Sequence, residues 1–152
     1  MISNLFPLWA ALIANVIAQV FKPFFYYIKT NQWRWTHIFE SGGFPSSHTA
    51  TASSLALATG IVDHFQSSAF AVAVIVCLVI CYDAANVRYY SGQNIRITQQ
   101  LVKDIELLTS TKLTDPIYQT RLKSVLGHKW IEVGGGFIWG IATTGILYLL
   151  FY

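Results

Sequence analysis

Two histidines in this chain have neighbours that suit phosphate chemistry. His48 follows two serines, and a serine placed there is typical of a helix start, whose free backbone N–H groups can bind an anion. His128 and Glu132 are four residues apart, so we expect their side chains to meet on one face of a helix. A carboxylate that contacts an imidazole fixes its tautomer and stabilises the cation that forms when the ring acts as a base or nucleophile. These residues predict phosphoryl transfer, although the His128–Glu132 pair alone could be an ion pair that anchors a helix.

The elements that must position these side chains belong to a membrane protein. Of the 152 residues, 54% are hydrophobic and only 11% are charged, against roughly 25% charged in an ordinary soluble domain. This composition excludes a disordered chain and most soluble enzymes, and the length predicts one domain, 1–152. The net charge of +3 is too small and too scattered for a nucleic-acid partner. Cys77 and Cys81 lie in an apolar run and are expected to be core residues rather than a disulfide framework.

Four long intervals without charged residues predict an all-α fold, an integral membrane bundle of about four transmembrane helices. Each interval is close to the roughly 20 residues that a helix needs to cross a bilayer. The expected spans are residues 3–26, 47–63, 66–84 and 131–151. The second interval opens with the polar stretch 41–48, so we expect its first turns to lie at the interface or in a polar cavity.

The connection 85–130 is long enough to have structure of its own. An apolar residue recurs at helical spacing at Ile97, Leu101, Ile105 and Leu108. This pattern predicts an amphipathic helix from about residue 94 to 108 that lies on the inner membrane surface. Segment 109–116 is then expected to be a loop with Pro116 as its breaker. A short helix that ends at Gly127 is expected to follow, with one apolar side made of Leu122, Val125 and Leu126.

The basic residues predict which side of the membrane each connection faces. All ten lie in the first connection (Lys22, Lys29 and Arg34) or in the third (Arg88, Arg96, Lys103, Lys112, Arg121, Lys123 and Lys129). Lys and Arg near the ends of spans are retained in the cytoplasm. We therefore expect a multi-pass protein of the cell membrane with both termini outside and both basic connections inside.

The polar side chains that a membrane helix excludes gather at this cytoplasmic boundary. They are Lys22 in the first span, Ser46, Ser47 and His48 at the start of the second, Asp83 and Arg88 after the third, and His128 and Glu132 at the start of the fourth. Ionisable groups at such depth are costly and usually face a bundle interior or a water-filled cavity, where they mark function. Lys22 or Arg88 alone could instead extend to the lipid headgroups. His37 and His64 have no such neighbours, and we expect them at the surface or the interface.

Three motifs stand in order along the chain and at one membrane boundary. They are GGFPSSHTA at 42–50, YDAANVR at 82–88 and LGHKWIEV at 126–133. Together they resemble the divergent branch of the type 2 phosphatidic acid phosphatase and vanadium-dependent haloperoxidase superfamily, over nearly the whole chain from Lys22 to the last helix. The resemblance implies that Lys22 binds phosphate, Ser46 and Ser47 line the phosphate pocket, His48 is the general acid, His128 is the nucleophile and Glu132 orients it.

Departures from the superfamily pattern leave alternatives at several positions. The pattern is K-x(6)-R-P, then P-S-G-H, then S-R-x(5)-H-x(3)-D. The second basic residue of the first motif is Lys29, Arg34 or neither. Ser47 replaces the glycine of the second motif, and Glu132 replaces the aspartate of the third. Leu122 stands where the third motif has arginine; we favour Arg88 as its replacement, with Asp83 as a partner, and Arg121 and Lys123 are the local alternatives.

The resemblance implies a membrane phosphatase that hydrolyses lipid or isoprenoid phosphate monoesters or pyrophosphates through a phosphohistidine. No metal or other cofactor is expected, and vanadate is expected to inhibit. The expected partners are membrane lipids and the amphiphilic phosphate substrate. The incomplete motifs leave the alternative of a non-catalytic membrane protein that binds lipid phosphates or acts as a partner subunit. A vanadium haloperoxidase would use the same pocket, but halide oxidation suits a chain so buried in lipid poorly.

The distribution of basic residues predicts a labelling pattern. A cysteine placed near Asp63 or after Tyr152 should react with a membrane-impermeant thiol reagent added to intact cells, and one near Thr111 should not, because the basic connections stay inside. The reverse pattern would move the candidate site to the outer face.

Overall fold

The computed structural model describes residues 4–39, 42–119 and 127–151, and every element in these ranges is helical. The α-helices are α1 (Phe6–Thr30), α2 (Ser47–Asp63), α3 (Ser68–Tyr82), α4 (Arg88–Thr109) and α5 (Trp130–Phe151). Short 3-10 helices lie at η1 (Trp35–Phe39) and η3 (Pro116–Gln119), and a π-helical segment, η2 (Asp83–Val87), joins α3 to α4. The predicted all-α class is confirmed.

The packing is that of a membrane protein, with small residues inside and large apolar residues outside. Ala14, Ala18 and Ala50 are fully buried, whereas Val72 and Leu149 are 63% and 79% exposed. Small side chains let helix backbones approach closely, and in a membrane the large apolar side chains are solvated by lipid. Among the described residues, three helical stretches are long and apolar enough to cross a bilayer: α1, the continuous run Ser68–Thr109, and α5.

Helix α2 is the central helix, which explains its polar sequence. It packs against α1, α3 and α5, and ten of its 17 residues are buried, most of them Ala, Ser and Thr. The Asn15 side chain of α1 donates a hydrogen bond to Thr51 Oγ1 at 2.8 Å. Because neighbouring helices rather than lipid surround it, α2 needs few large apolar residues. At about 1.5 Å per residue it is about 25 Å long, and four membrane spans remain a prediction.

Helices α2 and α5 touch backbone to backbone at two glycines. A Cβ on Gly136 would overlap the carbonyl oxygen of Ser46, and one on Gly140 would overlap Ser53 Oγ and the carbonyl oxygen of Ala50. One turn further on, Ser54 Oγ and Thr144 Oγ1 are hydrogen-bonded at 2.7 Å. This four-residue spacing of small residues is a common basis for close helix pairs in membranes.

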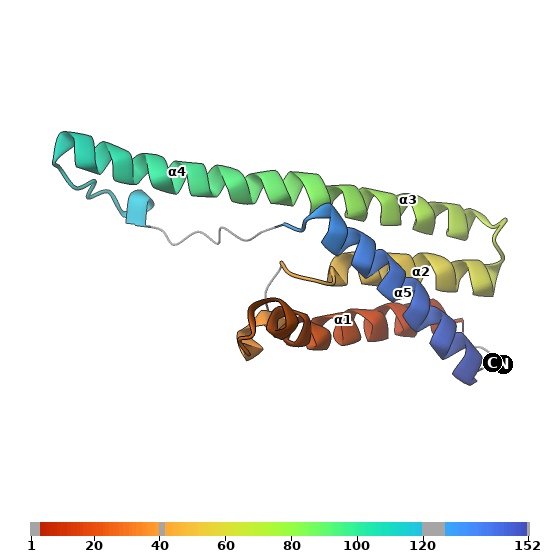
Figure 1. Cartoon of the computed structure of the whole chain (residues 1–152). Helices are drawn as coiled ribbons and strands as arrows, with labels where there is room; N and C mark the ends of the chain where they lie inside the picture. The colour runs from red at the N-terminus through yellow and green to blue at the C-terminus, as the bar shows by residue number, and fades with distance from the viewer. Residues whose placement is uncertain (1–3, 40–41, 120–126, 152) are drawn as a thin grey trace.

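The third span and the predicted amphipathic helix form one continuous helical run. The segment 83–88 contains neither proline nor glycine, so nothing ends the helix, and the π-helical turn of η2 joins α3 to α4. Helix α4 begins at Arg88 rather than near residue 94 and runs on in the direction of α3, away from the other helices (Figure 1). It therefore does not turn aside as a separate surface helix, which corrects that expectation. The apolar stripe is exposed, as Ile97 (65%) and Leu101 (55%) show.

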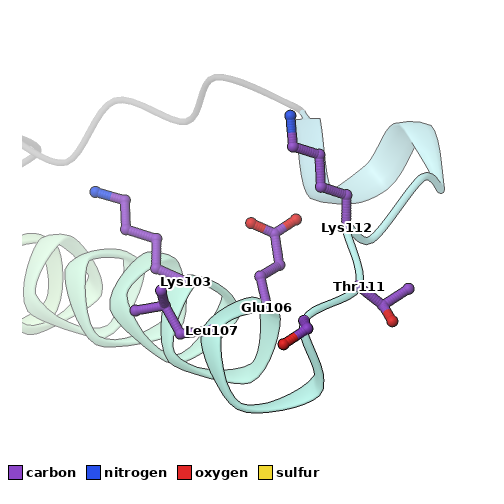
Figure 2. Close-up of a pocket in the computed structure, with 6 residues that line it drawn as sticks. Lys103, Glu106, Leu107, Thr111 and Lys112 are labelled. Atoms are coloured by element: carbon purple, nitrogen blue, oxygen red, sulfur yellow. The ribbon is translucent and has the colours of Figure 1, made fainter.

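The far end of α4 carries a pocket remote from the predicted site. Its volume is about 530 Å³, and Lys103 and Lys112 stand on either side of Glu106 (Figure 2). Glu106 Oε1 accepts a hydrogen bond from the backbone N–H of Leu113 at 2.9 Å, which ties the loop to the helix. The loop prediction is confirmed, and Pro116 begins η3. The short helix expected around Leu122, Val125 and Leu126, like Arg121 and Lys123, lies outside the described residues.

The predicted site residues lie toward one end of the bundle. The first turn of α1, the last turn of α5 and the α2–α3 connection lie at one end (Figure 1). The start of α2, the end of α3 and the start of α5 lie toward the other, where the predicted site residues are. Helices α1, α2, α3 and α5 begin and end within about one turn of the four expected spans, whereas α4 matches none of them. The side of the membrane that each end faces stays a prediction.

The α2–α5 contact predicts a difference between two glycines of α5. Gly140→Ala should lower the free energy of unfolding by about 1–3 kcal/mol, because the new methyl group has no room against α2. Gly145→Ala is the matched control, since a Cβ there meets nothing within 4 Å. Thermal unfolding of the purified protein in detergent measures both, and equal stabilities would contradict the contact.

Candidate active site

The start of α2 is capped as the sequence predicts. Ser46 is the N-cap, and its Oγ accepts hydrogen bonds from the Thr49 backbone N–H at 3.4 Å and from Thr49 Oγ1 at 3.1 Å. The next residue, Ser47, is only 1% exposed, and its Oγ is buried without a hydrogen-bond partner among the described residues. A buried hydroxyl without a hydrogen-bond partner lowers the stability of the fold, because its hydrogen bonds to water are lost and not replaced. Ser47 therefore offers a hydrogen-bonding group to a ligand.

Glu132 links the start of α5 to His128. One of its carboxylate oxygens, Oε2, lies 3.1 Å from His128 Nδ1 and accepts a hydrogen bond from the Lys129 backbone N–H at 3.2 Å. A glutamate in the third helical position that binds back to the capping N–H holds the first turn in place. The predicted contact exists, but α5 begins at Trp130, so His128 precedes the helix instead of sharing a helix face with Glu132. The helix start, rather than helical periodicity, brings the two groups together.

A backbone hydrogen bond joins the two helix starts. The Ser46 N–H donates to the carbonyl oxygen of Glu132 at 3.0 Å. The glycine contact at Gly136 lies one turn further along α5, against the carbonyl group of the same serine. The two serines predicted to line a phosphate pocket and the His128–Glu132 pair are thus parts of one unit.

The π-helical segment η2 positions the backbone of His128. The Arg88 N–H bonds to the carbonyl oxygen of Asp83, five residues back, and the carbonyl oxygen of Ala84 accepts the His128 N–H at 3.0 Å. Gly127 makes this approach possible, because a Cβ there would overlap the backbone nitrogen of Tyr89. Gly127 thus packs closely against the start of α4, and the short helix that it was expected to end lies outside the described residues. π-Helical turns are often found at functional sites.

His128 is buried with one ring nitrogen bound and the other unpaired. Its side chain is 1% exposed, Nδ1 is engaged by Glu132, and Nε2 is buried without a partner among the described residues. The ring of His48, which is exposed, has its centroid 6.3 Å from that of His128. The two imidazoles are therefore neighbours at this site.

Two cations stand near these histidines. Lys22, from α1, is 2% exposed. Arg88 donates from Nε to Asp83 Oδ2 at 2.6 Å, and both side chains of this pair are partly exposed. Lys22, Arg88 and Asp83 all lie close enough to interact electrostatically with His48. The structure thus brings both predicted cations to the site.

The other basic residues predicted to support the site have different positions. Arg34 lies in the exposed loop between α1 and η1 and is not among the described residues that line the adjoining cavity. Lys123 lies outside the described residues. His64 is exposed, in agreement with its expected surface position.

The sequence reading missed a cavity next to Glu132. Its volume is about 300 Å³, and it lies between α1, η1, the 42–44 turn and the start of α5. His37, which we expected at the surface or the interface, lines it, with its ring centroid 3.9 Å from that of Tyr26. The spacing of Lys22, Tyr26 and Lys29 at intervals of four and three residues could have indicated a shared face of α1.

The comparisons with known proteins agree with the motifs. Residues 3–143 match the family described as "Divergent PAP2 family", which confirms the resemblance. The chain is similar to "Uncharacterized membrane protein YuiD" of Bacillus subtilis (strain 168), with 32% identity over 151 residues that cover 96% of each protein. No solved structure matches.

Proposed function

Since the chain belongs to the divergent PAP2 family, we propose that it is a membrane phosphatase that works through a phosphohistidine. The observation that carries this proposal is the environment of His128. Glu132 holds Nδ1, so the tautomer is set, and Nε2 is left unpaired in a buried position. Ser47 Oγ, at the start of α2, is a second buried group without a partner among the described residues. A phosphate bound at this site would accept a hydrogen bond from Ser47 and present its phosphorus to the Nε2 lone pair.

The proposed reaction has two steps. In the first, His128 Nε2 forms a bond to phosphorus while the bond from phosphorus to the alkoxy oxygen breaks, and the electron pair stays on that oxygen. His48 gives this oxygen a proton, so an alcohol leaves. In the second, His48 takes a proton from water, the water oxygen bonds to phosphorus, and the phosphorus–nitrogen bond breaks to release phosphate and restore His128. Glu132 stabilises the imidazolium that forms in the first step.

Lys22 and Arg88 supply the electrostatic stabilisation in this scheme. Charge on the equatorial phosphoryl oxygens is the main target of catalysis in phosphoryl transfer. The Ser46 and Ser47 groups at the start of α2 would hold the same oxygens. The scheme requires no metal or other cofactor, and vanadate should inhibit because it adopts the shape of the pentacoordinate phosphorus.

The substrate class follows from the membrane location. A site at one end of a bundle that exposes large apolar side chains to lipid suits an amphiphilic phosphate with its chain in the bilayer. We propose lipid or isoprenoid phosphate monoesters or pyrophosphates. If the basic connections face the cytoplasm, the substrate comes from the inner leaflet.

One observation favours a second candidate, a non-catalytic protein that binds lipid phosphates. Nε2 of His128 is fully covered, and the arginine of the third motif is replaced. Purified protein assayed against a panel of lipid phosphates, with and without vanadate and a chelator, separates the two. Binding without release of phosphate would support the second candidate.

The position of Arg88 predicts the effect of its removal. Arg88→Ala should lower turnover by a factor of roughly 100–1000, as the loss of one preorganised oxyanion donor does. Arg96→Ala is the control, because Arg96 is exposed on α4 two turns further from the site. Steady-state phosphate release measures both, and equally small effects would remove Arg88 from the mechanism.

Replacement of each of the two histidines should affect activity in a different way. His128→Ala should be inactive on every substrate, since no phosphoenzyme can form. His48→Ala should lose about 100- to 10,000-fold on an alkyl lipid phosphate and much less on a nitrophenyl phosphate, whose phenolate leaves without a proton. The activity of Glu132→Gln should lie between those of His128→Ala and His48→Ala. Phosphate release on both esters tests this assignment, which fails if His128→Ala keeps activity on the nitrophenyl ester or if His48→Ala loses both substrates equally.

A further inference from the structure

The segment 31–39, which follows α1, packs on the bundle with one face only. Helix α1 ends at Asn31, whose backbone N–H bonds back to the carbonyl oxygen of Tyr27 at 2.7 Å. The 3-10 helix η1 then packs against α1, and the His37 ring lies 3.9 Å from the Tyr26 ring. The chain therefore folds back along the end of α1 instead of running on beyond it.

Large aromatic side chains form the other face of this segment. Trp33 is 46% exposed and Trp35 is 65% exposed. The Trp33 ring packs edge-on against two other rings, with centroids 5.8 Å from that of Tyr27 on α1 and 5.1 Å from that of Trp35. We call Tyr27, Trp33 and Trp35 the ring cluster. Because large apolar side chains exposed as a group mark an interaction site, the ring cluster requires a partner.

The ring cluster continues the lipid-facing surface of α1. Val20, Phe24 and Ile28 follow each other at intervals of four residues on this helix, and all three are exposed. At 1.5 Å per residue, the 25 residues of α1 are about 37 Å long. A bilayer has roughly 30 Å of hydrocarbon core and 40–45 Å with its headgroups. A bilayer that covers α1 therefore places its last turn, and the rings beside it, at one headgroup layer.

The charges near the ring cluster are basic. Lys29 and Arg34 are exposed, and Arg34 stands between the two tryptophans in the sequence. Residues 27–39 include no aspartate or glutamate. Tryptophan and tyrosine rings are typical of the level of the lipid headgroups, and basic side chains beside a membrane are attracted to anionic lipids. This combination of rings and cations matches an anionic lipid surface.

We propose that segment 31–39 docks onto the headgroup layer of the bilayer that α1 spans. Trp33 and Trp35 insert at the boundary between headgroups and acyl chains, and Arg34 binds the phosphates of anionic lipids. His37, on the inner face of the same segment, lines the cavity beside Glu132. The contact with lipid therefore supports one wall of that cavity. This docking is independent of the proposed reaction.

The first test measures the depth of the two tryptophans in nanodiscs. The other three tryptophans of the chain, Trp9, Trp130 and Trp139, are replaced by phenylalanine, so that only Trp33 and Trp35 emit. Lipids brominated near the headgroup end of the acyl chain should quench this emission more than lipids brominated near the methyl end. Acrylamide in the water should quench it weakly.

Two results would overturn the proposal. Strong quenching by acrylamide without quenching by brominated lipid would place the rings in water. Quenching by neither would mean that protein, such as a second copy of the chain, covers them. If the triple replacement weakens the fold, the lipid quenching that Trp33→Phe/Trp35→Phe removes from the unaltered protein gives the same measurement.

The second test measures lipid preference in nanodiscs with equal amounts of phosphatidylglycerol and phosphatidylcholine. Bromine on phosphatidylglycerol should quench Trp33 and Trp35 more than bromine on phosphatidylcholine. Arg34→Gln should weaken this local preference by about fivefold, as the loss of one basic residue near an anionic surface does, and Arg34→Lys should keep it. Arg96→Gln is the matched control, because Arg96 is exposed on α4. An absent preference, or one that Arg34→Gln leaves unchanged, would overturn the proposal.

Discussion

The close contact between α2 and α5 is the constraint on which the rest of the structure depends. Without side chains at Gly136 and Gly140, the two backbones can touch, and the Ser46 N–H can reach the carbonyl oxygen of Glu132. That contact sets the start of one helix beside the start of the other. The free N–H groups of helix starts attract anions. The close packing at the two glycines therefore also creates an electropositive corner, where the starts of α2 and α5 meet. The proposed chemistry of His128 therefore depends on glycines that lie outside the proposed active site.

Burial of the polar groups at this corner costs folding free energy and also strengthens their electrostatic interactions. Lys22, Ser47 and His128 are each at most 2% exposed, in a protein whose exterior is apolar. Charged and polar groups removed from water are stabilised only by partners that match them, and two atoms here, Ser47 Oγ and His128 Nε2, have none among the described residues. A phosphate bound at this corner would accept a hydrogen bond from Ser47 and present its phosphorus to His128 Nε2. The same low dielectric that makes the empty site costly strengthens every interaction with a bound phosphate.

Much of this arrangement could be predicted from local patterns. Charge-free runs predicted the helices, a serine before an apolar run predicted the cap at Ser46, and the spacing of His128 and Glu132 predicted their contact. The remainder depends on contacts between distant segments. The cavity exists because η1 folds back and sets His37 against Tyr26, and Gly127 is needed for its fit against the backbone at Tyr89. The continuity of α3 and α4 depends on a π-helical turn, which no periodic pattern reveals, so the sequence suggested a break where the helix goes on.

The unbroken helical run from α3 into α4 mechanically couples the far end of α4 to the bundle. Helix α4 has 22 residues, about 33 Å at 1.5 Å per residue, and it extends beyond the bundle with its apolar stripe uncovered (Figure 1). The base of this extended helix is η2. There the carbonyl group of Ala84 accepts a hydrogen bond from the His128 backbone, and α4 begins at Arg88. A stiff rod transmits a tilt applied at its tip to its base. A force that acts on the far end of α4 is therefore delivered to His128, the proposed nucleophile, and to Arg88, the proposed phosphate-binding cation, together.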